Sequence, residues 1–326
     1  IFLLYFINIT KIILIYFGKT AKRKTQKKAR CKTMNKNYIV PSFKDGRVFI
    51  SPVIGCCGGC KYCYLKLRNL TAPKLNCLSI EKILALITEN KEFKAGKNGT
   101  IISMGAWGDI FQTDRFIDMS INLIIELIKL GNPIQFMSKY KLDISLISKL
   151  AKYVQYTNQV LYSTTITTID KWKTIEPNTV SPEERIKTCK EFKNQGIESN
   201  VLIKPFIPGM TDLELDKIIY LLKEYNITYC VIGKLYISDD ILKSLGKDCL
   251  INTDALELST LDCNGNIKIQ ATQVKTLYKY IEKFRENGIN AFFKSSCVNS
   301  NINKTNNPSN YYFNNDEYCI NCGNCK

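Results

Sequence analysis

The stretch Gly55-Cys-Cys-Gly-Gly-Cys-Lys-Tyr-Cys-Tyr64 follows a strand-like run of β-branched residues and decides how the rest of the chain is interpreted. It sets Cys56, Cys60 and Cys63 at the spacing Cys-x3-Cys-x2-Cys, in a chain of 326 residues with 14 cysteines and no histidine. Three thiolates are one too few to complete the ligation of a four-iron cluster. The fourth iron is therefore open to a small molecule that carries an amine and a carboxylate.

Two alternatives apply to this loop. Closely spaced cysteines also bind zinc, but a structural zinc site takes four ligands and no fourth candidate lies nearby in the sequence. Cys57 offers a second register, Cys57-x2-Cys60-x2-Cys63. We interpret Cys57 as the spare.

The pattern beyond residue 48 predicts an α/β fold. Short β-branched runs alternate with longer amphipathic ones, which is typical of strand and helix units around a parallel sheet. We expect strands at 48–53, 100–104, 133–138, 159–165, 198–204 and 228–232, and helices at 79–92, 114–130, 142–152, 181–194 and 211–225, with Ser79, Ser181 and Thr211 as N-caps. Further on we expect a helix at 273–287, a strand at 291–294 and an Asn-rich polar loop at 299–315.

The cysteine spacing, with aromatic Tyr62 before the last cysteine, resembles the signature of the radical S-adenosylmethionine (SAM) superfamily. Residues 48–232 are similar to its spore photoproduct lyase-like branch, with Glu176-Pro177, Arg185, Gly196-Ile197 and Pro205-Phe-Ile-Pro-Gly209 in the same order. The resemblance implies a partial (β/α)6 TIM-type barrel with the cysteine loop after the first strand. It also implies a 4Fe-4S cluster, S-adenosyl-L-methionine and an electron donor such as a flavodoxin or ferredoxin.

Five residues are candidates for binding the cofactor. Gly105 allows close approach of a ligand and Asp109 offers a carboxylate to an amine, although both also fit a simple turn. Ser163 and Thr165 share one face of a strand and offer hydroxyls, although threonine also favours strands in general. Arg185 neutralises the cofactor carboxylate, tethers Glu176, or is a surface helix residue.

One feature of the branch is missing. Spore photoproduct lyase uses a cysteine near the end of the second strand as a hydrogen donor, and Gly105-Ala-Trp107 contains none. This argues against repair of thymine dimers as the activity. In a chain without histidine, lysine, tyrosine, cysteine or carboxylates must serve any proton transfer.

A second group of cysteines closes the chain. Cys319, Cys322 and Cys325 are tightly spaced, and Cys297 is the candidate for a fourth ligand. Four sulfur ligands fit a second 4Fe-4S cluster or a zinc ion. We interpret the scattered Cys230, Cys249 and Cys263 as core residues.

The distribution of charge and the spacing of the cysteines indicate the domain organisation and the cellular compartment. Residues 1–33 hold nine lysines and arginines and no acid, more than half of the formal net charge of +17. This segment is a basic and apolar extension, either an anchor or sequence upstream of a true start at Met34. We expect the barrel at 45–235 and a C-terminal extension at 236–326. Metal-type cysteine spacing indicates a reducing, cytoplasmic compartment and no membrane partner.

The sequence thus predicts a radical SAM enzyme whose substrate is open. Positive charge and the branch resemblance favour nucleic acid, and the C-terminal cysteines favour a peptide. A non-enzymatic alternative is an iron-sulfur or zinc protein that carries electrons or acts as a binding module.

Overall fold

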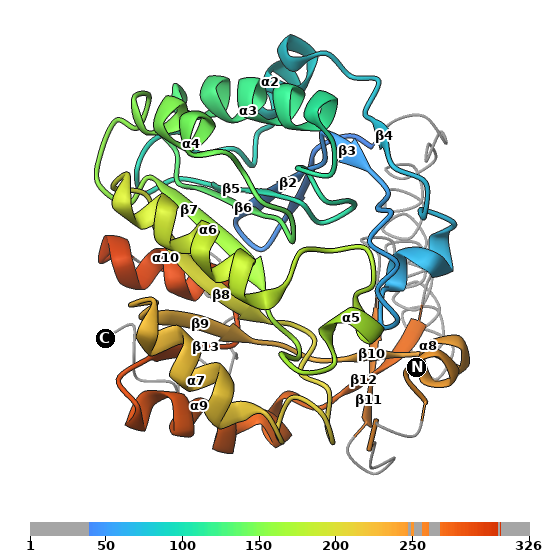
Figure 1. Cartoon of the computed structure of the whole chain (residues 1–326). Coiled ribbons are helices and arrows are strands. Elements are labelled where there is room, and N and C mark those ends of the chain that lie inside the picture. Colours follow the sequence, from blue (N-terminus) through green and yellow to red (C-terminus); the bar gives the residue numbers. More distant parts are fainter. Residues whose placement is uncertain (1–38, 247–248, 251–255, 261–267, 306, 308–326) are drawn as a thin grey trace, which may run out of the picture.

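A curved, mostly parallel sheet forms the centre of the computed structural model, which describes residues 39–246, 249–250, 256–260, 268–305 and 307 (Figure 1). Its strand order is β1-β2-β5-β6-β7-β8-β9-β13. Only β1 is antiparallel to its neighbour. The bounds are β1 Ser42–Lys44, β2 Arg47–Ile50, β5 Ile101–Met104, β6 Ile134–Met137, β7 Val160–Thr165, β8 Glu198–Ile203, β9 Tyr229–Ile232 and β13 Asn290–Phe292.

Helices between these strands pack against the convex face of the sheet, here called the outer face. They are α2 Ile80–Thr88, α3 Asp114–Ile128, α4 Ile144–Ala151, α6 Pro182–Asn194, α7 Leu215–Glu224 and α9 Tyr278–Glu286, whereas the short α5 (Trp172–Ile175) buries Ile175 in a separate cluster with Cys60 and Tyr62. One continuous apolar core joins them to the sheet, with Ile102, Ile134 and Val201 among its strand residues. The predicted α/β partial barrel is confirmed, and its sheet is open rather than closed.

Two of the three predicted helix N-caps are confirmed. Ser79 accepts a hydrogen bond from the Lys82 backbone N–H, and Ser181 accepts one from Glu184. Thr211 is not a cap, because α7 begins at Leu215 and the Thr211 hydroxyl instead donates to the Thr167 carbonyl at 2.7 Å. That bond ties the loop after β8 to the loop after β7.

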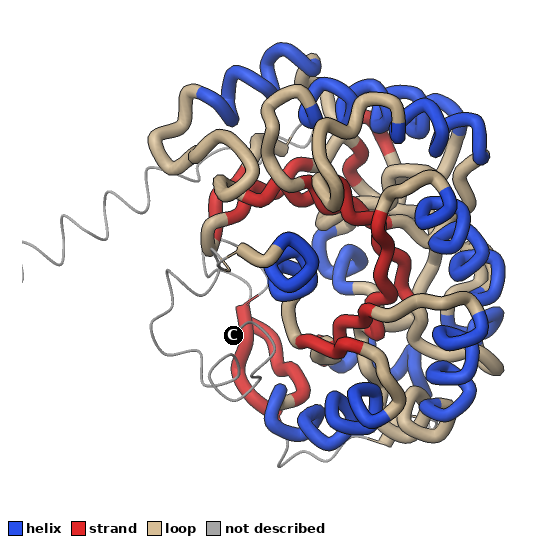
Figure 2. Tube along the Cα trace, turned by 90° about the vertical axis from the view of Figure 1, so that its left-hand side faces the viewer, coloured by secondary structure: helices blue, strands red, loops and turns tan. Residues whose placement is uncertain are grey.

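The concave face, here called the inner face, holds one helix, α10 (Ser295–Asn303). Viewed from the left of Figure 1, this helix stands inside the curve of the sheet (Figure 2). Cys297 and Val298 pack there on Leu161, Leu202 and other inner-face residues. The prediction of a polar loop was therefore wrong for residues 299–303, because packing on the sheet overrides the Asn-rich composition.

Smaller elements lie around the edge of the sheet where the parallel strands end, here called the carboxyl rim. They are β3 (Val53–Ile54) paired with β4 (Lys74–Leu75), and β10 (Tyr236–Ile237), β11 (Leu256–Thr260) and β12 (Lys268–Thr272) in a second sheet. The short helices η1 (Tyr64–Arg68), α8 (Asp239–Leu245) and η4 (Val274–Leu277) complete the set. Within the described residues no helix combines the length and hydropathy needed to cross a membrane.

Candidate active site

The cysteine loop, residues 55–63, leaves the carboxyl rim after β2 and β3. Gly58 lies between two of its thiols: a Cβ there would be 3.2 Å from Cys56 Sγ and 3.7 Å from Cys60 Sγ. The Gly58 backbone N–H donates to Cys56 Sγ at 3.3 Å. Cys63 follows through a turn in which its N–H donates to the Cys60 carbonyl. The loop therefore brings sulfur donors together around a backbone kept free of side chains.

Burial sets the protonation of these thiols. It raises the pKa of Cys56 to about 11 and that of Cys60 to about 12, and it raises the pKa of Cys63 as well. The thiols are therefore protonated at neutral pH, and a metal must displace these protons to bind. In the part of the chain that the structure describes, no three His, Cys, Asp or Glu side chains already stand as a metal-binding group.

Cys57 has different surroundings. Its side chain is exposed, and its sulfur lies 3.7 Å from the Tyr140 hydroxyl. Its backbone N–H donates to Gln112 Oε1 at 2.7 Å. These contacts hold Cys57 against the loops after β5 and β6. They favour Cys56, rather than Cys57, as the first of the three proposed ligands.

A distant segment fastens the loop from the other side. In residues 175–179, here called the Glu-Pro segment, the Ile175 carbonyl accepts from the Lys61 N–H at 2.9 Å. The Asn178 side-chain amide donates to the Cys57 carbonyl at 2.9 Å, and the Asn178 N–H donates to the Gly58 carbonyl at 3.3 Å. The predicted Glu-Pro motif therefore acts as a backbone clasp on the cysteine loop.

A buried chain of side chains completes this clasp. The Tyr62 hydroxyl donates to Glu176, whose carboxylate pairs with Arg185 at 2.5 Å, and both charged side chains are essentially unexposed. Burial, together with Glu176, raises the pKa of Tyr62 well above its usual value, so its phenol stays a donor. Tyr62 lies between two of the cysteines, so the charge pair of Glu176, at the end of α5, with Arg185 of α6 positions the loop.

Arg185 thus has the tethering role among its predicted alternatives. Its guanidinium also donates to the Thr165 and Val180 carbonyls at 2.7 and 2.8 Å and to the Thr179 hydroxyl. The surface-residue alternative is wrong because the side chain is fully enclosed. Direct contact of Arg185 with the cofactor carboxylate stays a prediction.

Gly105 and Asp109 build the wall opposite the Glu-Pro segment. Gly105 has a φ of +99°, and a Cβ there would lie 2.8 Å from Met137 Cγ, so the position requires glycine. The Asp109 carboxylate accepts from the Ser138 hydroxyl at 2.6 Å and the Lys139 N–H at 2.7 Å. Asp109 Oδ1 also accepts from the Phe111 N–H at 3.1 Å, so the turn-capping alternative is present in the structure, and amine binding by the remaining lone pairs stays a prediction.

Ser163 and Thr165 lie on the inner face, as the strand alternation predicts. The Ser163 hydroxyl donates to Asn200 Oδ1 on β8 at 2.6 Å, whereas Thr164 on the other face donates to the Ser138 carbonyl. Both inward side chains are buried. Their contact with a cofactor stays a prediction.

With this geometry in place, comparison with known proteins identifies the family. The sequence model of the radical SAM superfamily matches residues 50–232. The chain belongs to the radical SAM superfamily. No curated protein matches the chain.

Solved structures of the superfamily share the fold. Spore photoproduct lyase complexed with dinucleoside spore photoproduct has a TM-score of 0.60 at 15% identity, with 80% of each chain covered. A double mutant of the same enzyme, with bound AdoMet and the same ligand, gives 0.57 at 15% identity, over 76% of this chain and 75% of that one. Streptococcus suis SuiB bound to precursor peptide SuiA gives 0.50 at 15% identity, over 89% and 64%. At this identity the likeness shows the fold alone.

Membership makes the chain a radical SAM enzyme and implies a 4Fe-4S cluster and SAM. The cysteine loop fits such a cluster by the chemistry of its donors, since three soft thiol ligands lie within eight residues around a glycine backbone. The same set lacks the fourth ligand that structural zinc takes.

Sequence reasoning missed several residues at this site. Lys139 follows β6 directly and its ammonium lies 5.7 Å from the Tyr62 ring centroid. Tyr64 donates to the Ala106 carbonyl at 2.8 Å and meets Trp107 and Tyr236 edge to face, while Arg68 lies over Trp107 at 4.4 Å. Position at the ends of strands was the available signal for Lys139, but no sequence pattern joins the aromatic group.

Of the four cysteines predicted to bind a second cluster, the structure describes Cys297. Cys297 is buried in α10 and accepts from the Asn307 side-chain amide at 3.2 Å. Cys319, Cys322 and Cys325, like residues 1–33, lie outside the described residues. The four-cysteine site therefore stays a prediction. Cys230 is buried in the outer-face core and Cys249 packs against the core near the cysteine loop, while Cys263 lies outside the described residues.

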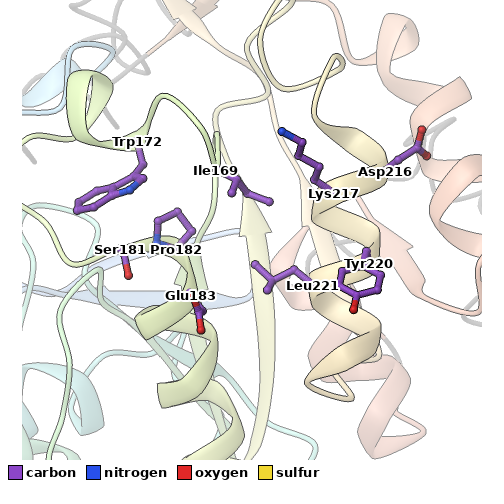
Figure 3. Close-up of a pocket in the computed structure, with 9 residues that line it drawn as sticks. All are labelled: Ile169, Trp172, Ser181, Pro182, Glu183, Asp216, Lys217, Tyr220 and Leu221. Atoms are coloured by element: carbon purple, nitrogen blue, oxygen red, sulfur yellow. The ribbon is translucent and has the colours of Figure 1, made fainter.

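A pocket of about 510 Å³ lies elsewhere, between α5, α6 and α7 (Figure 3). Trp172, Pro182, Tyr220 and Leu221 line it. None of the cysteine loop residues lines it, and its walls belong to the helical layer outside the sheet. We assign it no part in the chemistry.

Proposed function

We propose that this chain binds its 4Fe-4S cluster through Cys56, Cys60 and Cys63 and uses it to cleave SAM reductively. When bound, the cluster would supply the electron that cleaves SAM into methionine and a 5′-deoxyadenosyl radical, and that radical would remove a hydrogen atom from the substrate. The observation that carries the proposal is the three-thiol loop at the carboxyl rim, where parallel α/β barrels place their chemistry.

The protein's own residues hold the site. The Tyr62, Glu176 and Arg185 chain and the Asn178 bonds fix the loop from one side. Asp109, through Ser138 and Lys139, fixes the rim on the other. The proposed cofactor contacts are Gly105, Asp109, Ser163, Thr165 and Arg185. A site held from both sides suits radical chemistry, in which the protein's task is to position the cofactor and the substrate.

The test is formation of 5′-deoxyadenosine. The chain is purified without oxygen, reconstituted with iron and sulfide, reduced with dithionite and given SAM. We expect 5′-deoxyadenosine from the wild type and from Cys57→Ser, and none from the variant with Cys56, Cys60 and Cys63 all changed to alanine. An electron carrier or zinc protein would form none in any sample, and activity in the triple variant would refute the ligand assignment.

The C-terminal cysteines are proposed to hold a second 4Fe-4S cluster, with zinc as the alternative. Iron analysis separates these outcomes: about eight irons per chain for two clusters and about four for one. Changing Cys319, Cys322 and Cys325 to alanine should halve the iron if the second centre is a cluster. Zinc analysis of the same samples identifies the alternative.

The ligands of structurally similar proteins suggest two classes of substrate. One is described with a dinucleoside spore photoproduct and another with a precursor peptide. Nucleic acid is our first proposal because of the positive charge of the chain, and a peptide is the alternative. A lack of binding to single-stranded DNA or RNA at low salt would remove the first proposal. A reduced flavodoxin or ferredoxin is the proposed electron donor, and replacing dithionite with either tests it.

A further inference from the structure

Cys56 and Cys57 are adjacent, and only one of them is needed as the first ligand of the proposed cluster. The registers Cys56-x3-Cys60 and Cys57-x2-Cys60 start one residue apart, so a shift of one residue exchanges the two thiols. Cys56 Sγ accepts from the Gly58 N–H at 3.3 Å, on the side of Gly58 that faces Cys60 Sγ. Cys57 is exposed, with its sulfur beside Tyr140. Something other than spacing must therefore keep the two positions distinct.

The side-chain amide of Gln112 holds the backbone of Cys57. Gln112 lies in the loop between β5 and α3, and its Oε1 accepts from the Cys57 N–H at 2.7 Å. Its Nε2 donates to the Asp109 carbonyl at 2.8 Å and to the Gly55 carbonyl at 3.3 Å. Exchange of the two amide atoms would set a donor against the Cys57 N–H, so these partners fix the orientation of the amide. Gln112 thus ties the Cys57 peptide to the loop that carries Asp109.

Two further side chains hold the remaining groups of Cys57. The Asn178 amide donates to the Cys57 carbonyl at 2.9 Å. The Tyr140 hydroxyl donates to the Asn178 carbonyl at 2.8 Å and lies 3.7 Å from Cys57 Sγ. A phenol has one hydrogen, which Tyr140 gives to Asn178, so the Cys57 thiol is the donor in its contact with Tyr140. The N–H, the carbonyl and the sulfur of Cys57 are each held, by side chains from three separate segments.

The start of the loop is fixed as well. The Gly55 N–H donates to the Trp107 carbonyl at 2.7 Å, and Gly55 pairs with Gly108 in an isolated β-bridge. A Cβ on Gly108 would lie 2.5 Å from the Gly55 carbonyl oxygen, so the two backbones approach this closely only with glycine there. Because these contacts prevent the loop from sliding, a change of register requires the Cys57 peptide to turn in place. The contact with Gln112 opposes that turn.

We propose that Gln112, Asn178 and Tyr140, together called the register lock, hold Cys57 away from the cluster and leave Cys56 as its first ligand. The inference rests on the proposed function and deepens it by naming the residues that choose between two neighbouring thiols. Gln112 is a positioning residue, because it acts through the backbone of Cys57. Without it the Cys57 peptide is free to turn, and Cys57 takes the place of Cys56 in part of the molecules.

The first test maps the thiols that the cluster protects. The full chain is reconstituted without oxygen, treated briefly with iodoacetamide, digested with trypsin and sequenced by tandem mass spectrometry. In the wild type we expect label on Cys57 and protection of Cys56. Peptides with label on Cys60 are left out, so loss of the cluster does not enter the ratio. In Gln112→Ala the ratio of Cys56 label to Cys57 label should rise about fivefold, the scale of one neutral hydrogen bond.

Gln155→Ala is the matched control for this measurement. It removes the same side chain from an exposed position before β7 and should reproduce the wild-type ratio. A merely structural role of Gln112 would lower the amount of bound cluster but would not exchange the label between two adjacent cysteines.

The second test asks whether release of the register lock replaces a missing ligand. Cys56→Ala should bind little iron, because Cys57 is held and does not substitute. Adding Gln112→Ala to Cys56→Ala should raise the bound iron about threefold, within the range for one lost hydrogen bond. Adding Cys57→Ala as a third change should remove this gain. Asn178→Ala replaces Gln112→Ala if that variant does not fold, because it releases the carbonyl of the same peptide.

Several outcomes would overturn the register lock while leaving the proposed function in place. They are bound iron with an unchanged labelling ratio in Gln112→Ala, wild-type iron in Cys56→Ala, and no gain of iron on release. Protection of Cys57 with label on Cys56 in the wild type would reverse the assignment of the ligand. A wild type that binds no iron would instead refute the proposed function, and this inference with it.

Discussion

The two faces of the sheet are made of different chemistry. The outer face presents Ile102, Ile134 and Val201 to the helices, and a single apolar core seals it. The inner face of the sheet carries Ser103, Ser163 and Asn200, and the Ser103 hydroxyl and the Asn200 amide nitrogen are buried with no hydrogen-bond partner among the described residues. Native proteins rarely leave buried polar atoms unpaired. The outer face therefore supports stability, and the inner face offers the polar groups that we propose for ligand contacts.

The largest expected effect comes from a change in the Glu-Pro segment, which contributes both to stability and to the position of the cysteine loop. Glu176→Ala leaves Arg185 charged and enclosed, which should lower the free energy of unfolding by about 3–5 kcal/mol, the range for breaking one buried ion pair. It also removes the partner of Tyr62, so reconstituted iron should fall. Chemical denaturation and iron analysis measure the two effects.

Glu183→Ala is the matched control, because it removes an exposed ion pair of α6 with Lys187 and should change little. Equal behaviour of the two variants would mean that the buried pair does not position the cysteine loop. It would also weaken the distinction between residues that stabilise the fold and residues that position the site.

A substitution that creates a cavity in the outer-face core should lower stability without changing SAM cleavage. Ile218 on α7 is fully buried, and Ile218→Ala should cost about 2–5 kcal/mol of unfolding free energy, as large-to-small core changes do. SAM cleavage per folded molecule, measured well below the unfolding temperature, should stay at the wild-type rate. Tyr220→Ala, at an exposed position on the same helix, should leave both quantities unchanged. A drop in cleavage for Ile218→Ala would show that the outer core also shapes the site.

The smallest effect compares one buried serine from each side. The Ser120 hydroxyl on α3 donates to the Ile110 carbonyl at 3.1 Å, so Ser120→Ala should cost about 1 kcal/mol. The Ser103 hydroxyl has no partner to lose, and Ser103→Ala should be neutral or slightly stabilising. Thermal unfolding of both variants gives the comparison. A clear loss of stability for Ser103→Ala would show that its hydroxyl is already satisfied and would weaken the assignment of the inner face to ligands.

Local patterns explain which predictions were confirmed. The cysteine spacing, the strand and helix alternation and the Ser79 and Ser181 caps all depend on residues close in sequence. The Asn-rich composition misled for α10, because the packing of Cys297 and Val298 on the sheet outweighs weak helix propensity. The C-terminal metal site stays a prediction because its three clustered cysteines lie outside the described residues.

The sequence alone determined the ligand loop and the class of fold, because three thiols on one short loop and the period of apolar residues are local properties of the chain. Only the tertiary structure decided that Arg185 pairs with Glu176, which accepts a hydrogen bond from Tyr62, and that Asn178 binds the backbone of the cysteine loop. These partners are separated by up to 121 positions in sequence. Their contact depends on the curvature and register of the sheet, which no local pattern encodes.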